Sequence, residues 1–133
     1  MKTTITLLSS LLAISIASHA SANTDQFSVA ALTPSQDIQS ISVKVHVRTD
    51  CTSGGCSTTN ETNEGLPKKY ITQFLPALSY KQLSNDHDNT IEFGYYDLNT
   101  NKSIFPQSCL IHINSFAANS AQVSMSKNGC KIS

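Results

Sequence analysis

Apolar and polar residues alternate over eight positions between residues 41 and 48. This is the period of a strand that has one buried face and one exposed face. The alternation assigns one set to the core and the other to solvent: Ile41, Val43, Val45 and Val47 face inward, and Ser42, Lys44, His46 and Arg48 face outward. All four inward residues are β-branched, which favours the pleated sheet further. The segment therefore predicts a half-buried strand.

Short apolar stretches separated by polar turns fill the chain from residue 84 onward, which is typical of an antiparallel meander. We expect strands at 90–98, 103–105, 109–113 and 122–126. Gly94 is a candidate bulge in the first of these strands, and Pro106 interrupts the second. The last two strands are predicted to pair as a hairpin that brings Cys109 close to Cys130. A tight turn at 127–129 then precedes the end of the chain.

The segment 66–83 carries apolar residues spaced by four, which favours a helix that begins after Pro67. Pro76 argues against one continuous helix, because proline lacks an amide hydrogen and clashes with the preceding turn. We expect a short helix near 68–75 followed by an extended stretch near 78–83. A pair of strands is the alternative.

Two polar stretches show no sustained period. Residues 23–37 are interpreted as a lead-in segment, partly ordered through its apolar residues, ahead of a single disulfide-stapled β domain at 38–133. Residues 50–65 contain no large apolar side chain and predict a long polar loop, a type of segment that often carries function. The fold predicted is mainly β: a small antiparallel sandwich or curled sheet, with at most one short helix and two disulfides.

The first 22 residues have the features of a secretory signal peptide. Lys2 supplies a positive start, residues 5–16 are mostly apolar, and Ala20-Ser21-Ala22 is a small-residue cleavage site. The apolar core of about 12 residues is shorter than the roughly 20 that a membrane helix needs. We therefore predict an exported protein, periplasmic or extracellular, that has no transmembrane segment after cleavage at Ala22.

The charge balance excludes some partners. Nine Lys and Arg residues face nine Asp and Glu residues, and removal of Lys2 with the signal peptide leaves a net charge of about −1. Nucleic-acid binding is not expected, because that function needs a concentrated basic surface. The sequence contains no basic amphipathic segment of the kind that binds a membrane surface, so such binding is not expected.

All four cysteines lie beyond the signal peptide, and an even number in a small exported chain predicts two disulfides. We favour Cys51–Cys56, which closes a short ring containing two glycines, together with Cys109–Cys130. The rival pairing, Cys51–Cys109 with Cys56–Cys130, stays open. No pair of cysteines forms a C-x-x-C redox motif, and none has zinc-binding spacing with histidine.

Candidate catalytic residues are few. His46 and His112 fall on the polar faces of alternating segments, where a solvated imidazole is expected. His87 lies between Asp86 and Asp88, a set that offers nitrogen and oxygen ligands to a metal but is also typical of a turn. No G-x-S-x-G elbow occurs, and we predict no cofactor.

The leading hypothesis is an exported, non-enzymatic binding or interaction protein: a periplasmic inhibitor, an accessory factor or a surface-assembly subunit. The polar segment 51–65 is expected to contact the partner, which is a protein or a glycan. Tyr95 and Tyr96 are candidate binding residues, because adjacent strand positions face opposite sides and one ring is left available for stacking. The alternative is a small secreted hydrolase or metal-dependent enzyme that uses His87 with Asp86 or Asp88. Oligomeric state does not follow from the sequence.

Overall fold

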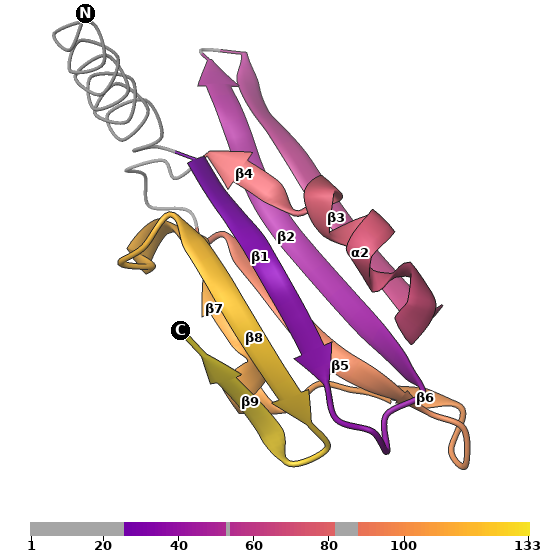
Figure 1. The fold of residues 1–133 in the computed structure, drawn as a ribbon. Helices are drawn as coiled ribbons and strands as arrows, with labels where there is room; N and C mark the ends of the chain where they lie inside the picture. Colours follow the sequence, from indigo (N-terminus) through magenta and orange to yellow (C-terminus); the bar gives the residue numbers. More distant parts are fainter. Residues whose placement is uncertain (1–25, 53, 82–87) are drawn as a thin grey trace, which may run out of the picture.

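A computed structural model describes residues 26–52, 54–81 and 88–133, without the side chains of 49–52 and 56. The predicted signal peptide lies outside the described residues, as do Asp86 and His87. Two sheets pack against each other (Figure 1). One sheet has the strand order β4-β1-β8-β9, and the other has the order β3-β2-β5-β6, with β7 also paired to β5. The mainly β prediction is confirmed.

Strands and short helical turns make up the described chain. In chain order, the strands are β1 (Gln26–Pro34), β2 (Ser40–Thr52), β3 (Gly55–Pro67), β4 (Ser79–Lys81), β5 (Thr90–Asp97), β6 (Lys102–Ile104), β7 (Leu110–His112), β8 (Ser120–Ser126) and β9 (Gly129–Ile132). The helical turns are η1 (Lys68–Tyr70), α2 (Ile71–Phe74), η2 (Leu75–Ala77), η3 (Gln107–Cys109) and η4 (Ile113–Ser115).

Strand β2 confirms the predicted alternation on its inward side. Its four inward residues are buried in one apolar cluster with residues of both sheets. Ser42, predicted to face solvent, is also buried, with 0% exposure. Its hydroxyl pairs with the Ser103 hydroxyl at 2.7 Å and accepts a hydrogen bond from the Gly65 amide at 3.4 Å. Neighbouring segments cover the outer face of β2 at Ser42. A polar side chain can be buried there because its hydroxyl forms hydrogen bonds with both of these neighbours.

Residues 26–34 form β1, which lies between β4 and β8 and runs parallel to β8. The buried residues of β1 change phase along the strand, from Phe27 and Val29 to Leu32. A register shift between Val29 and Ala31 causes this change, because a bulge inserts one residue and reverses which side faces the core. The lead-in segment therefore contains a core strand whose period is broken in its middle.

Strand β3 occupies most of the segment predicted to be a polar loop, so that prediction is wrong. Residues 55–67 pair antiparallel with β2, from Gly55 opposite Thr52 to Pro67 opposite Ser40. The described side chains of β3 are exposed or only partly buried on both faces, so the strand shows no apolar alternation. Backbone pairing to β2 and several β-branched threonines hold it extended instead.

The predicted hairpin between 109–113 and 122–126 is also wrong. Strand β7 pairs with β5, whereas β8 lies in the other sheet between β1 and β9. Strands β6 and β7 share one edge of β5, and the chain between them leaves the ladder as η3. Gly94 marks no bulge, because β5 runs without a register shift there. A Cβ at Gly94 would instead overlap the backbone oxygen of Ile104, so only glycine fits this close approach.

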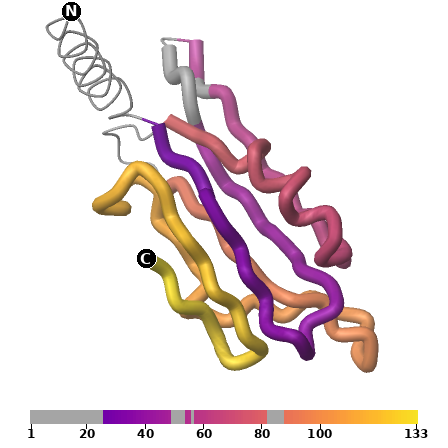
Figure 2. The backbone as a smooth tube through the Cα atoms, in the orientation of Figure 1, coloured from indigo at the N-terminus to yellow at the C-terminus, as the bar shows by residue number. Residues whose placement is uncertain are grey.

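Each side of the sandwich is closed in a different way. On one side η1, α2 and η2 carry the chain from β3 of one sheet to β4 of the other, and Ile71 is buried there. This matches the predicted short helix followed by an extended stretch, and the tube in Figure 2 shows the path. On the other side a disulfide joins Cys109, in η3, to Cys130 in β9, with the two Cα atoms 4.9 Å apart.

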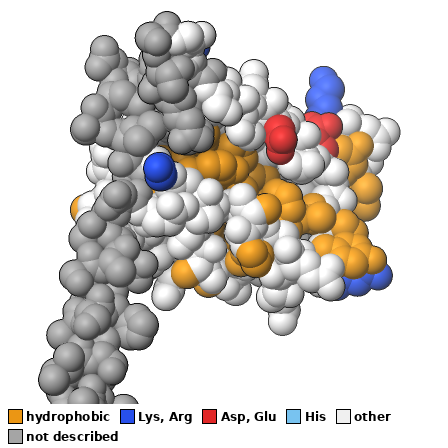
Figure 3. Space-filling model, turned by 90° about the horizontal axis from the view of Figure 1, so that it is seen from above, with side chains coloured by type: hydrophobic (Ala, Val, Ile, Leu, Met, Phe, Trp, Pro, Cys, Tyr) orange, Lys and Arg blue, Asp and Glu red, His pale blue; other side chains and the backbone are white. Residues whose placement is uncertain are grey.

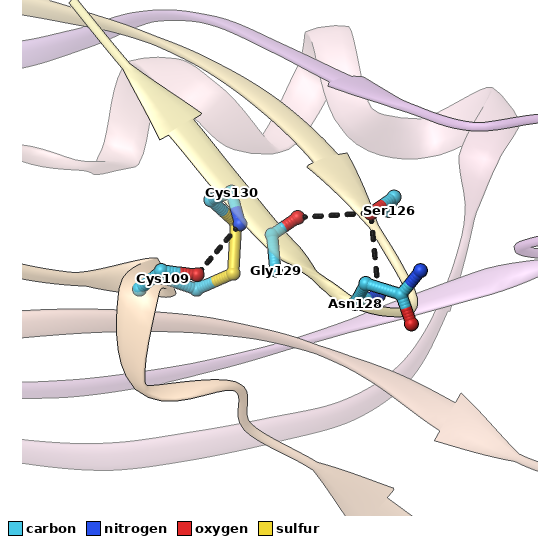
Figure 4. Close-up of a disulfide and its surroundings, with 6 residues drawn as sticks. Cys109, Ser126, Asn128, Gly129 and Cys130 are labelled. Atoms are coloured by element: carbon cyan, nitrogen blue, oxygen red, sulfur yellow. Dashed lines mark hydrogen bonds between the residues drawn. A yellow bond between two sulfur atoms is a disulfide. The ribbon is translucent and has the colours of Figure 1, made fainter.

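The Cys109–Cys130 disulfide confirms one predicted pairing and excludes the rival one. Ser126 and Gly129 shape the turn before Cys130 (Figure 4). The Cys130 amide donates a hydrogen bond to the Ser108 hydroxyl at 2.9 Å. Gly129 has a φ of 143°, a conformation that favours glycine, as expected of the predicted tight turn. The side chains of Cys51 and Cys56 lie outside those described, so their pairing stays a prediction.

Candidate functional site

The two tyrosines predicted to bind a partner lie at the end of β5. Tyr95 is half-buried and packs against the core, and the Lys127 ammonium lies 6.0 Å from the centre of its ring. Tyr96, also half-buried, faces the other side and lies next to Gly65. Both line a cleft of about 200 Å³ together with Asp37 and Asp97. Neither ring is widely exposed, so their role in binding stays a prediction.

The charges in this cleft are arranged by local hydrogen bonds. A hydrogen bond from the Ser35 hydroxyl lowers the pKa of the exposed Asp37 carboxyl, and the positive charges of Lys127 and Lys68 act in the same direction. The Asp97 carboxylate accepts a hydrogen bond from the Asn99 amide at 3.0 Å. These carboxylates therefore stabilise the turns that border the cleft, and nothing in their geometry requires a ligand.

The two described histidines that were predicted, His46 and His112, do not form a common site with a carboxylate cluster. His112 Nδ1 lies 2.8 Å from Asp88 Oδ1, but the two side chains are 51% and 73% exposed. An exposed pair of this kind contributes little to stability. His46 on β2 and His112 on β7 both pair with Thr90 of β5, which lies between them. Two strand spacings therefore separate their Cα atoms by about 10 Å. Among the described residues, no three His, Cys, Asp or Glu side chains group to hold a metal.

A more distinctive feature is the outer edge of β3. Strand β3 ends its sheet, and within the described chain no strand pairs with its other edge. Between residues 57 and 63 the pairing with β2 has no register shift, and this stretch contains no proline, lysine or arginine. Most of its side chains are exposed, and Thr59 is partly buried. Edge strands are usually blunted by bulges, charged side chains or proline. This stretch has no bulge and no proline, and its one charged side chain is Glu61, opposite Val45.

Asn89 reveals which peptide groups of β3 point outward. This buried amide accepts a hydrogen bond from the Arg48 amide at 2.9 Å and donates to the Arg48 carbonyl at 3.1 Å. The Arg48 peptide groups therefore point away from β3. Because successive residues of a strand direct these groups to opposite edges, Val47 and Val45 direct theirs toward β3.

The direction of the peptide groups carries over to the paired residues of β3. Thr59 is opposite Val47 and Glu61 is opposite Val45, so both bond to β2. The alternate residues Thr58, Asn60 and Thr62 consequently present their N–H and C=O groups at the outer edge. This row of outward peptide groups is called the free edge.

One charged side chain of β3, Glu61, acts electrostatically on Tyr80 in β4. Burial raises the pKa of the Tyr80 phenol in β4, and the negative charge of Glu61 raises it further. Tyr70 is 41% exposed, with the Lys69 ammonium 5.1 Å from its ring centre. A view of the molecule from above shows hydrophobic side chains in a band at the surface, next to acidic ones (Figure 3).

The segment 51–65, predicted to contact the partner as a polar loop, consists mostly of strand β3. The signal for a strand was present, because residues 57–63 contain three threonines and neither glycine nor proline. No protein family, curated protein or solved structure matches the chain. No helix in the described part of the chain is long and apolar enough to cross a membrane.

Proposed function

We propose that the protein is an exported, non-enzymatic interaction protein that binds by adding a partner's strand to the free edge. The observation that supports this proposal is the row of outward peptide groups at Thr58, Asn60 and Thr62. An exposed sheet edge offers main-chain hydrogen bonds to any extended segment that reaches it. The alternate side chains on each face then decide which segment fits.

Export is supported by the sequence of residues 1–22, and the Cys109–Cys130 disulfide fits an oxidising compartment. The enzymatic alternative has weaker support. Asp88, one of its proposed carboxylates, is engaged by His112, and this pair is exposed rather than set in a closed cleft. Catalytic pairs rely on burial and positioned neighbours to shift their pKa values.

The proposal is tested with a photo-crosslinking amino acid placed at Asn60 in cells that secrete the protein. A matched position on the opposite side of the sandwich, Lys131 in β9, serves as control. We expect a discrete adduct from position 60 and none from position 131.

A second step asks whether backbone hydrogen bonds are responsible. With the crosslinker at Thr62, Asn60→Pro removes one outward N–H, whereas Asn60→Ala keeps it. Proline is tolerated on an edge strand where its nitrogen faces solvent, so both variants should fold, which a melting curve checks. The adduct should be lost with proline and kept with alanine. An equal adduct in both variants, or none at either position, contradicts strand addition.

A further inference from the structure

We propose that the strand added at the free edge is β3 of a second copy, in antiparallel orientation about a two-fold axis at Asn60. This inference rests on the proposed function and specifies its partner. The result is one continuous sheet through two molecules, with the strand order β5-β2-β3 repeated in reverse across the axis. An interface in which the same surface meets itself is the usual form of a symmetric dimer.

The register follows from the outward peptide groups. Hydrogen-bonded pairs across the axis must use Thr58, Asn60 and Thr62 from both copies. All three are used only when Asn60 faces Asn60 of the second copy and Thr58 faces its Thr62. This register gives about six hydrogen bonds between the copies, because each such pair exchanges two.

The side chains in this register are self-complementary. Thr58–Thr62 and Asn60–Asn60 pairs form on one face, and hydroxyl and amide side chains can hydrogen-bond to their own kind. Thr59 faces Glu61 on the other face, which pairs a hydroxyl donor with a carboxylate acceptor. Every pair is polar and none requires burial of an apolar side chain.

Charge distinguishes this register from the neighbouring one. Glu61 is the only charged residue between 57 and 63. A shift that moves the axis to residue 61 would place the two Glu61 carboxylates directly opposite each other, and opposed like charges are destabilising. The axis at Asn60 avoids this repulsion and keeps the largest number of hydrogen bonds.

Cysteine substitutions test the register directly. In the proposed dimer the two Asn60 Cα atoms are about 5.5 Å apart, which is suitable for a disulfide. Asn60→Cys should therefore form a covalent dimer in air, identified by the mass of two linked peptides that each contain position 60. Thr58→Cys or Thr62→Cys alone should stay monomeric on a non-reducing gel, whereas a mixture of these two variants should crosslink. Crosslinking by Thr58→Cys alone to the same extent as Asn60→Cys overturns the register.

A pair of charge variants tests the interface without a covalent bond. Thr59→Glu places a carboxylate opposite Glu61 of the other copy, and Thr59→Lys places an ammonium there. Sedimentation equilibrium should show that glutamate weakens dimerisation on the order of tenfold and that lysine strengthens it. Thermal melting confirms that both variants fold. Equal dissociation constants for the two variants contradict the proposed contact.

The two proposals fail in different ways. If the purified protein stays monomeric at all concentrations and Asn60→Cys does not crosslink, the second copy is excluded. If secreting cells then show an adduct to a different chain, and Asn60→Pro abolishes that adduct, strand addition remains the proposed mode of binding, with another partner. If those adducts are also absent, both proposals are overturned.

Discussion

Strands β2 and β3 have the same length of 13 residues and pair along most of it, yet they are built from opposite kinds of residue. Strand β2 buries Ile41, Val43, Val45 and Val47 in the core. Strand β3 exposes polar side chains on both of its faces. The difference shows that β2 is held in place by burial of its own side chains. Strand β3 is held by backbone pairing with β2.

The largest expected contrast comes from truncating one side chain on each strand. Ile41→Ala should lower the free energy of unfolding by about 2–5 kcal/mol, because it leaves a cavity in the core. Thr58→Ala on β3 should change it by no more than about 0.5 kcal/mol, since this side chain is exposed. Denaturant unfolding measures both. A large loss from Thr58→Ala would mean that side-chain contacts, rather than backbone pairing, hold β3 in place.

Loss of the disulfide tests the side of the sandwich away from β3. Replacing Cys109 and Cys130 by alanine should cost about 3 kcal/mol, as expected for a crosslink that closes a loop with a sequence separation of 21. Hydrogen exchange should increase most in β9 and remain low in β2. An equal increase of hydrogen exchange in β2 would show that the two sides of the sandwich are not independent.

Reciprocal isosteric changes at one cross-strand pair sharpen the contrast further. Val47 and Thr59 lie directly opposite each other. Val47→Thr should destabilise by about 1–3 kcal/mol, because it buries a hydroxyl among apolar side chains. Thr59→Val should be within about 0.5 kcal/mol of the original protein. Comparable losses from the two changes in denaturant melts would remove the distinction between the strands.

The smallest expected effect is the electrostatic contact between β3 and β4. The pKa of Tyr80 is raised above its ordinary value of 10.0, chiefly by burial and then by Glu61. The unfolded chain therefore ionises first, so this contribution to stability is complete below pH 10 and is lost as pH rises above it. Glu61→Gln should lower the Tyr80 pKa in a phenolate absorbance titration, with Tyr80→Phe identifying the signal. An unchanged titration would place Glu61 too far away to act.

The sequence predicted well those elements whose own side chains decide their structure. The alternation of β2 and the spacing of apolar residues before Pro76 both indicated the observed elements. It predicted β1 and β3 poorly for two different reasons. In β1 a bulge near Ala30 breaks the period. In β3 none of the described side chains is buried deeply enough to create a period.

The Cys109–Cys130 disulfide was predicted correctly from a hairpin that does not form. The alternation at 109–113 suits any neighbouring strand, and β5 is the one that pairs with it. The turn that contains η3 then brings Cys109 against β9 from the other sheet. The segment that forms the free edge was predicted to be a loop that contacts a partner. Its conformation was predicted wrongly because polar composition does not distinguish a loop from an edge strand, and its role in binding stays a prediction.

The exposure of both faces of β3 has a consequence for how the sequence can vary. If the free edge binds a partner as proposed, substitutions between residues 57 and 63 would alter what it recognises while leaving the buried core of β2 untouched. Stability and partner choice would then be separately adjustable. Related chains under pressure from changing partners would accumulate differences along β3 and keep β2 almost constant.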